Sequence, residues 1–233
     1  MLSVLLMSKS PLILALDSQE IERCSALIEE TSEYIGVFKL GLEFFSANGP
    51  GGVANLKKRF PEIGIFLDLK LHDIPNTVGK ASASLACLDV DYLTVHAQGG
   101  SEMIKAAVLA LPETRITAVT VLTSLDQVAL SSLGIERPVE ELASRWAELA
   151  VASGARAIVA SPLEVKALRA SLPRDISLIT PGIRPAASDD DQKRTMSPKD
   201  AITAGADFLV IGRPITGAVD ARSAARSIFE SLE

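Results

Sequence analysis

Residues 64–77 read Gly-Ile-Phe-Leu-Asp-Leu-Lys-Leu-His-Asp-Ile-Pro-Asn-Thr and combine a strand pattern with charged side chains. The apolar start is typical of a strand buried on both faces, as in a parallel sheet that helices cover. Because side chains alternate along a strand, Asp68 and Lys70 are predicted to lie on one face, about 7 Å apart. Charges on an apolar strand lower stability unless they are paired or take part in chemistry. A structural ion pair, with Asp73 as the N-cap of a helix that begins near Pro75, is the alternative interpretation.

Seven other apolar runs along the chain have the same character, and a helical pattern follows each of them. The runs cover residues 12–16, 35–40, 92–95, 115–122, 157–160, 176–180 and 208–211. Alternating strands and helices predict a parallel sheet, and eight such units predict a closed TIM (β/α)8 barrel. An open doubly wound sheet is the alternative, but no Gly-x-Gly-x-x-Gly turn follows the first run. Since composition is uniform along the chain, we expect residues 1–233 to form a single catalytic domain.

Helical patterns follow the predicted strands, and one of them contains a break. The clearest patterns cover residues 19–33, 77–88, 139–153 and 162–171. The sequence Asn-Gly-Pro-Gly-Gly at residues 48–52 predicts a break, followed by a short basic helix that ends near Phe60.

Composition limits the classes of partner. The 233-residue chain has 23 Lys and Arg against 29 Asp and Glu, a formal net charge of -6, which argues against nonspecific binding to nucleic acid. No run reaches the roughly 18 apolar residues that a membrane-spanning helix needs. Cys24 and Cys87 form neither a disulfide framework nor a metal-ligand cluster, and we expect both to be buried thiols in helices. We therefore expect a cytoplasmic protein with no nucleic-acid or membrane partner.

Polar residues recur where the predicted strands end. They are Asp17, Lys39, Asp68, Lys70, Asp73, His96, Thr123, Arg184 and Arg213. In a (β/α)8 barrel the carboxyl ends of all strands meet at one face, where the active site lies. One shared site explains all of these residues, whereas a structural explanation must treat each of them separately. We expect His96 to line the pocket and His72 to have a structural role.

The eighth unit has the features of a phosphate site. Gly212 permits close approach of the backbone, Arg213 supplies a fork of hydrogen-bond donors, and Pro214 can open a helix whose N-terminus favours an anion. Phosphate sites after strands seven and eight are frequent in this architecture. Residues 184–198 form a long polar segment with three aspartates at its centre. A segment this long in a compact barrel is usually either a functional lid or disordered, and we expect a lid that closes over the phosphate.

Together these residues resemble a known family. The chain is similar to bacterial orotidine 5'-monophosphate decarboxylases along essentially its whole length. The matching motifs are Ala-Leu-Asp at 15–17, Lys-Leu-Gly at 39–41, Asp-Leu-Lys-Leu-His-Asp-Ile-Pro-Asn-Thr at 68–77, Thr-Val-His-Ala at 94–97, Pro-Gly-Ile-Arg at 181–184, Gln192, and Ile-Gly-Arg-Pro-Ile-Thr at 211–216. The Asp-x-Lys-x-x-Asp core also occurs in sugar-phosphate decarboxylases and synthases of the same superfamily. The combination of this core with Lys39 and the Pro-Gly-Ile-Arg loop is specific to the orotidine 5'-monophosphate decarboxylases.

The resemblance implies conversion of orotidine 5'-monophosphate to uridine 5'-monophosphate, the last step of de novo pyrimidine nucleotide synthesis, with no cofactor and no metal. It implies that Lys70 donates a proton to C6 of the pyrimidine and that Asp68 lies beside the substrate carboxylate. Lys39 and Asp73 would complete the catalytic array. The implied substrate-binding residues are Asp17, Lys39, Asp68, Thr77, Thr123, Pro181, Arg184, Gln192, Gly212 and Arg213. A homodimer is also implied, in which Asp73 and Thr77 reach into the site of the other subunit.

Two other functions stay open at this point. A magnesium-dependent sugar-phosphate decarboxylase of the same superfamily has an acidic metal ligand at the end of strand two. This chain has Lys39 there, and its ammonium would repel a divalent cation. A non-catalytic phosphate-binding barrel would bind nucleotide without turnover, but buried charges that serve no reaction only lower stability. Sensitivity to a chelator separates the first alternative from the decarboxylase, and tolerance of Lys70→Ala separates the second.

Overall fold

Eight parallel strands close into a barrel in the computed structural model, which describes residues 10–184 and 196–232. In chain order the strands are β1 (Leu12–Ala15), β2 (Val37–Gly41), β3 (Gly64–Leu71), β4 (Tyr92–His96), β5 (Arg115–Val119), β6 (Ala157–Val159), β7 (Ser177–Thr180) and β8 (Phe208–Ile211). Each strand pairs with the next one along the chain, and β8 pairs with β1 through Leu209 and Leu12, which closes the sheet. The predicted (β/α)8 barrel is confirmed.

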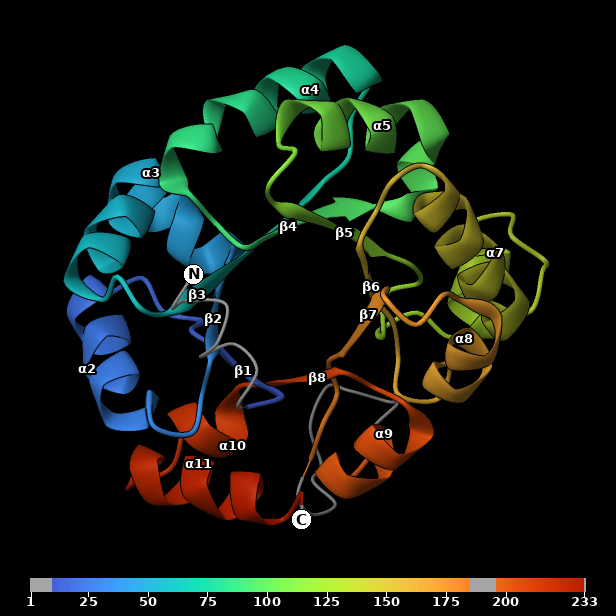
Figure 1. The fold of residues 1–233 in the computed structure, drawn as a ribbon. Coiled ribbons are helices and arrows are strands. Elements are labelled where there is room, and N and C mark those ends of the chain that lie inside the picture. Colours follow the sequence, from blue (N-terminus) through green and yellow to red (C-terminus); the bar gives the residue numbers. More distant parts are fainter. Residues whose placement is uncertain (1–9, 185–195, 233) are drawn as a thin grey trace.

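Helices surround the barrel. They are α2 (Ile21–Thr31), α3 (Leu42–Arg59), α4 (Pro75–Ser84), α5 (Gly100–Ala110), α6 (Gln127–Ser132), α7 (Val139–Ala152), α8 (Val165–Ser171), α9 (Pro198–Ala204), α10 (Arg213–Thr216) and α11 (Ala221–Glu230), with 3-10 helices η1 (Ala86–Leu88) and η2 (Ala97–Gly99). In Figure 1 the units follow one another around the barrel axis in sequence order, from blue α2 to red α11. This is the order that βαβ connections of a single hand produce around a closed sheet.

Side-chain alternation along the strands divides the core into two parts. Inward-facing residues fill the barrel, and they include Ile13, Val37, Phe66, Tyr92 and Ile179. The rings of Phe66 and Tyr92 meet edge to face inside the barrel, with centroids 5.6 Å apart. The outward-facing residues of the same strands pack against the helices in a second, larger cluster. The strands are therefore buried on both faces, as their nearly continuous apolar runs predict.

The segment labelled α3 is interrupted at Gly49, within the break that the sequence predicts at residues 48–52. Gly49 has φ 59° and ψ -164°, which is not helical, so α3 consists of two helices that meet at a kink. Pro50 follows directly, where its fixed φ suits a first helical turn and its missing N–H removes no helical hydrogen bond. Phe44 on one side of the kink and Val53 on the other both pack into the core. The predicted break is therefore confirmed, and packing against the core holds the helices on both sides of it.

The expectation of two buried thiols is correct only for Cys24. Burial raises the pKa of the Cys24 thiol to about 11. Cys87 is exposed because α4 ends at Ser84 and Cys87 lies in the separate short helix η1.

Within the described residues, no helix combines the length and the apolar character required to cross a bilayer.

Candidate active site

A cavity of about 550 Å³ opens at the carboxyl ends of the strands. Its lining includes most of the residues that the sequence predicts for the site, namely Asp17, Lys39, Asp68, Lys70, Thr123, Pro181, Arg184, Gly212 and Arg213. The barrel brings these residues together from strands that are far apart in the sequence. The volume falls in the range of small-molecule sites, which is about 300–1,000 Å³.

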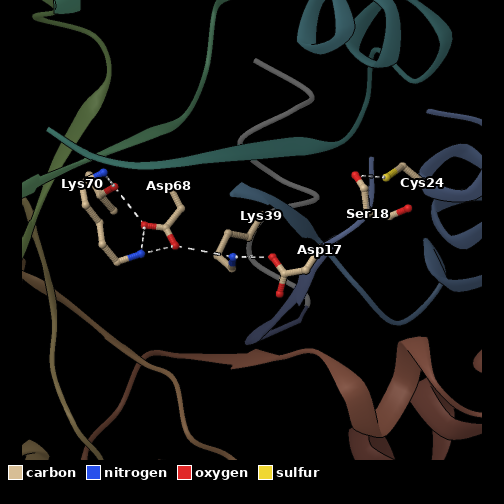
Figure 2. Close-up of polar contacts among 7 residues, drawn as sticks. Asp17, Ser18, Cys24, Lys39, Asp68 and Lys70 are labelled. Carbon is tan, nitrogen blue, oxygen red and sulfur yellow. Dashed lines mark hydrogen bonds and ion pairs between the residues drawn. The ribbon is translucent and has the colours of Figure 1, made fainter. Parts of the chain in front are cut away.

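Four charged side chains of alternating sign form a row in this cavity (Figure 2). Lys39 Nζ lies 3.2 Å from Asp17 Oδ1 and 3.5 Å from Asp68 Oδ2. Lys70 Nζ donates to both carboxylate oxygens of Asp68 at 2.8 Å. The side chains of Lys39 and Asp68 are each 11% exposed, and that of Lys70 is 30% exposed. Water and salt therefore screen the two pairs made by Asp68 less than they screen ion pairs on the surface.

Strand β3 is irregular where it presents Lys70. The pairing register of β3 with β4 shifts between Leu67 and Leu71, so that residues 68–70 lie opposite Thr94 alone. Lys70 has φ 49°, in the left-handed region that non-glycine residues seldom adopt. Such a conformation costs about 1–3 kcal/mol and is found mainly at functional sites. Bulges next to active sites change the direction of a side chain, and here the ammonium of Lys70 contacts Asp68.

The two lysines keep Asp68 ionised. Burial by itself raises the pKa of this carboxyl group. The positive charges of Lys39 and Lys70, together with hydrogen bonds from Lys70 and Thr94, outweigh burial, so that the pKa of Asp68 lies below its usual value. Asp68 is therefore an anion near neutral pH, and it pairs with the Lys70 ammonium and aligns it.

Two arginines form the second charged part of the cavity. Arg184 follows β7 and is 9% exposed, and Arg213 follows β8. Gly182 turns the chain after β7 with φ 79°, a left-handed conformation that glycine adopts freely. The backbone N–H of Arg184 donates to the carbonyl of Met196 at 3.0 Å, which joins this loop to the segment that precedes α9. Two arginines in one cavity suit a phosphate, because guanidinium donors match the geometry of its oxygens.

The predicted phosphate motif after β8 has the expected local structure. Gly212 is the N-cap of α10, and Pro214 lies in its first turn. Gln192 and residues 185–195 of the predicted lid lie outside the described residues, so their roles stay predictions.

Apolar side chains form the remaining walls of the cavity. They are Phe66, Val119, Val121, Val159 and Val210 with their neighbours Leu122 and Ala160. Thr123 is the predicted polar residue among them, since it follows β5 and lines the same space. The cavity is therefore suited to a ligand with an uncharged body and anionic groups at the two charged parts.

Asp73 and Thr77 lie outside the cavity of their own chain. Both are exposed, and Asp73 lines a separate shallow hollow with Ile74 and Pro75. The interpretation of Asp73 as an N-cap is wrong, because the N-cap of α4 is Ile74. Asp73 Oδ1 instead accepts a hydrogen bond from the backbone N–H of Ile74 at 2.6 Å. A role of Asp73 and Thr77 in the site of another subunit stays a prediction.

The expectation that His96 lines the pocket is wrong. The cavity lining does not include it, and its ring faces that of His72 with centroids 5.4 Å apart. Burial lowers the pKa of His96, and the charges of His72 and Lys70 lower it further, which favours the neutral imidazole.

The family model described as "Orotidine 5'-phosphate decarboxylase / HUMPS family" matches residues 10–228. The chain belongs to this family. A protein named orotidine 5'-phosphate decarboxylase from Thermobifida fusca is 48% identical over 225 residues, which cover 96% of each chain. One of the same name from Moorella thermoacetica is 47% identical over 237 residues, covering 97% of this chain and 93% of the relative. The crystal structure of orotidine 5'-phosphate decarboxylase from Lactobacillus acidophilus matches with a TM-score of 0.83 and 36% identity, covering 96% of this chain and 99% of the other.

One polar residue at the candidate site of this family member was not predicted from the sequence. Thr94 on β4 is fully buried, and its hydroxyl bridges Lys70 and Asp68. The available signal was its position in the strand, since Thr94 is two residues from Tyr92 and therefore faces the barrel interior on the same side. The attention given to strand ends left out a polar residue inside a strand.

Proposed function

We propose that this protein converts orotidine 5'-phosphate to uridine 5'-phosphate and carbon dioxide, in pyrimidine nucleotide synthesis, with Lys70 as the proton donor. The observation that carries the proposal is the row of alternating charges from Asp17 to Lys70, which lies in the cavity of a chain that belongs to this family. Relatives 42–48% identical over nearly the whole chain are named orotidine 5'-phosphate decarboxylase.

The residue types suit the reaction. When the bond from C6 to the carboxylate breaks, carbon dioxide leaves and the electron pair stays on C6, where the pyrimidine ring delocalises it poorly. An ammonium fixed beside C6 stabilises this charge as it develops. Lys70 then transfers one N–H proton to C6, which forms the C–H bond of the product, and the lysine regains a proton from solvent. Asp68 holds the Lys70 ammonium through two hydrogen bonds of 2.8 Å.

In the same proposal, the remaining residues bind the substrate away from C6. Arg184, Arg213 and Gly212 line the part of the cavity suited to the phosphate. We propose that Gln192, which lies outside the described residues, also binds the phosphate. Asp17 and Lys39 contact the ribose hydroxyls, and Thr123 the pyrimidine, with Pro181 beside it. Phosphate binding would supply free energy that helps to orient the reacting group, so loss of the phosphate should lower turnover as well as affinity.

The proposal includes a homodimer in which Asp73 and Thr77 complete the site of the other subunit. Three features support it. Both residues are exposed, neither lines the cavity of its own chain, and Ile74 between them is 65% exposed, which is unusual for a large apolar side chain.

We also place the reaction in the cytoplasm, where a reducing environment preserves free thiols such as that of Cys87.

No metal takes part in the proposed reaction. The position of Lys39 supports this, since its ammonium lies between the carboxylates of Asp17 and Asp68, at 3.2 and 3.5 Å. A divalent cation held by those two carboxylates would be repelled by Lys39. The magnesium-dependent sugar-phosphate decarboxylase remains the second candidate because it shares the Asp-x-Lys-x-x-Asp core at residues 68–73.

Ultraviolet absorbance of orotidine 5'-phosphate tests the proposal directly. We expect the wild-type protein to consume this substrate equally well with and without EDTA. Lys70→Ala should lower kcat/KM by at least about 10³-fold, since both charge stabilisation and proton transfer are lost. The matched control is Lys166→Ala, which removes an exposed lysine on α8 and should retain wild-type activity.

Two results would contradict the proposal. Absence of turnover by a folded, dimeric wild-type protein would remove the decarboxylase function, and sugar phosphates with added magnesium would be assayed next. Nucleotide binding without turnover, unchanged by Lys70→Ala, would favour the non-catalytic barrel.

A further inference from the structure

Thr94 connects the two central residues of the row although it does not line the cavity. Its side chain is fully buried on β4. Thr94 Oγ1 accepts a hydrogen bond from the backbone N–H of Lys70 at 2.8 Å. The same oxygen donates to Asp68 Oδ1 at 3.0 Å. A hydroxyl can donate and accept at the same time, and this site uses both capacities.

The position of Thr94 explains why a hydroxyl is required there. Residues 68–70 of β3 lie opposite Thr94 alone, so the regular ladder between the two strands is interrupted. The Lys70 N–H takes the Thr94 hydroxyl as its acceptor in place of a backbone carbonyl on β4. A buried N–H without a partner costs about 1–3 kcal/mol. The hydroxyl thus stabilises the bulge in which Lys70 has its left-handed φ of 49°.

The second hydrogen bond acts on the carboxylate. Asp68 Oδ1 accepts from both Thr94 and Lys70 Nζ, at 3.0 and 2.8 Å. A carboxylate can rotate about its terminal torsion, since that torsion has broad minima. A donor fixed on the neighbouring strand limits this rotation and so fixes the direction in which Asp68 presents its oxygens to Lys70.

We propose that Thr94 is a positioning residue for decarboxylation, which sets the backbone of Lys70 and the carboxylate plane of Asp68 through a single bridging hydroxyl. This inference rests on the proposed function of Lys70. Thr94 acts through these two residues and does not contact the substrate. Its loss should therefore lower the rate of the chemical step and leave substrate binding nearly unchanged, because a misplacement of about 1 Å can reduce a rate by about 10²-fold.

The test compares Thr94→Val, which keeps the size but lacks the hydroxyl, with Thr94→Ser, which keeps the hydroxyl. For Thr94→Val we expect kcat for orotidine 5'-phosphate to fall about 10- to 100-fold, with KM and the Kd for uridine 5'-phosphate within about threefold of wild type. Thr94→Ser should recover kcat to within about threefold of wild type. Thermal unfolding followed by circular dichroism establishes that each variant is folded under the assay conditions.

Thr117→Val is the matched control. Thr117 is also fully buried on the inner side of the barrel, on β5, but its hydroxyl bonds only the carbonyl of Arg115, at 3.0 Å. Its loss should change stability without lowering kcat. If Thr94→Val does not fold, Thr94→Ala and Thr94→Ser form the comparison instead, and the same difference in kcat is expected.

Three outcomes would overturn the role of Thr94. They are an unchanged kcat in Thr94→Val, an equal loss of kcat in Thr94→Ser, and a matching loss in Thr117→Val. Failure of the underlying function is distinguishable from all three, because wild-type protein and Lys70→Ala are assayed alongside. If the wild type turns over and Lys70→Ala does not, a negative result with Thr94 concerns Thr94 alone.

Discussion

Asp68 has two lysine ammonium groups within 3.5 Å of its carboxylate, and this arrangement makes the stability of the protein depend on pH. Burial raises the pKa of Asp68, but the two positive charges and the hydrogen bonds lower it by more. A carboxyl group whose pKa is lower in the folded state stabilises the fold above its unfolded pKa, about 3.9. That stabilisation is lost as the pH falls through the folded pKa.

We therefore expect Asp68→Asn to lower the free energy of unfolding by about 1–3 kcal/mol at pH 7, since two lysines lose their shared counter-charge. The difference from wild type should be constant from pH 7 to about pH 5 and should shrink below about pH 4, where Asp68 of the unfolded chain takes up a proton. Urea unfolding of both proteins at a series of pH values measures this difference. Asp17→Asn is the control, because the Asp17 side chain is 57% exposed and its loss should cost no more than about 1 kcal/mol. A difference that stays constant down to pH 3 would contradict the role of Asp68.

Helix α3 shows how two nearby glycines differ in their contribution to stability. Gly49 has φ 59° and ψ -164°, a conformation nearly confined to glycine, whereas Gly51 lies within the helical part. A Cβ atom added at either position would meet no atom within 4 Å, so only the backbone decides the outcome. We expect Gly49→Ala to lower the free energy of unfolding by about 1–3 kcal/mol. Gly51→Ala should raise it by about 0.5–1 kcal/mol. Urea unfolding of both variants measures the two changes in the free energy of unfolding. Equal changes would show that the backbone at Gly49 is not strained.

The elements of the barrel were predictable because each strand carries its own signal. The runs from Leu12 and from Phe208 start where β1 and β8 start, since burial on both faces demands continuous apolar residues. The break in α3 was predictable for a similar reason, because glycine and proline interrupt helices, and Gly49 has a non-helical conformation. The register shift of β3 was not predictable, since alternation alone gives Asp68 and Lys70 the same face without the bulge between them.

The site was predictable to the extent that barrel topology converts strand ends into neighbours. Asp17, Lys39 and Asp68 are far apart in the sequence, yet the successive strands β1, β2 and β3 bring each charged group next to the following one. Two residues of β4 were not predictable in this way. Thr94 lies inside the strand and not at its end. His96 lies at the strand end, but its ring lies beside that of His72 and does not line the cavity.

At the scale of the whole molecule, the position of Asp73 outside its own cavity leads to a test of shared sites. If each site combines Lys70 of one subunit with Asp73 of the partner subunit, then Lys70→Ala and Asp73→Ala homodimers each have two defective sites. In a mixed dimer, one site has both substitutions and the other has neither. With random exchange in an equal mixture, roughly half of the dimers are mixed and each has one intact site, so activity should recover to about a quarter of the wild-type value.

The measurement is the rate of orotidine 5'-phosphate consumption after the two inactive variants have been unfolded and refolded together. A mixture of Lys70→Ala and Lys39→Ala is the matched control, since these two residues lie in the same cavity of one chain. A mixed dimer of these variants has one substitution in each site, and no recovery is expected. If the mixture with Asp73→Ala also stays inactive although mixed dimers form, Asp73 acts within its own chain, and the exposed segment from Asp73 to Thr77 would have to fold back toward the cavity during the reaction.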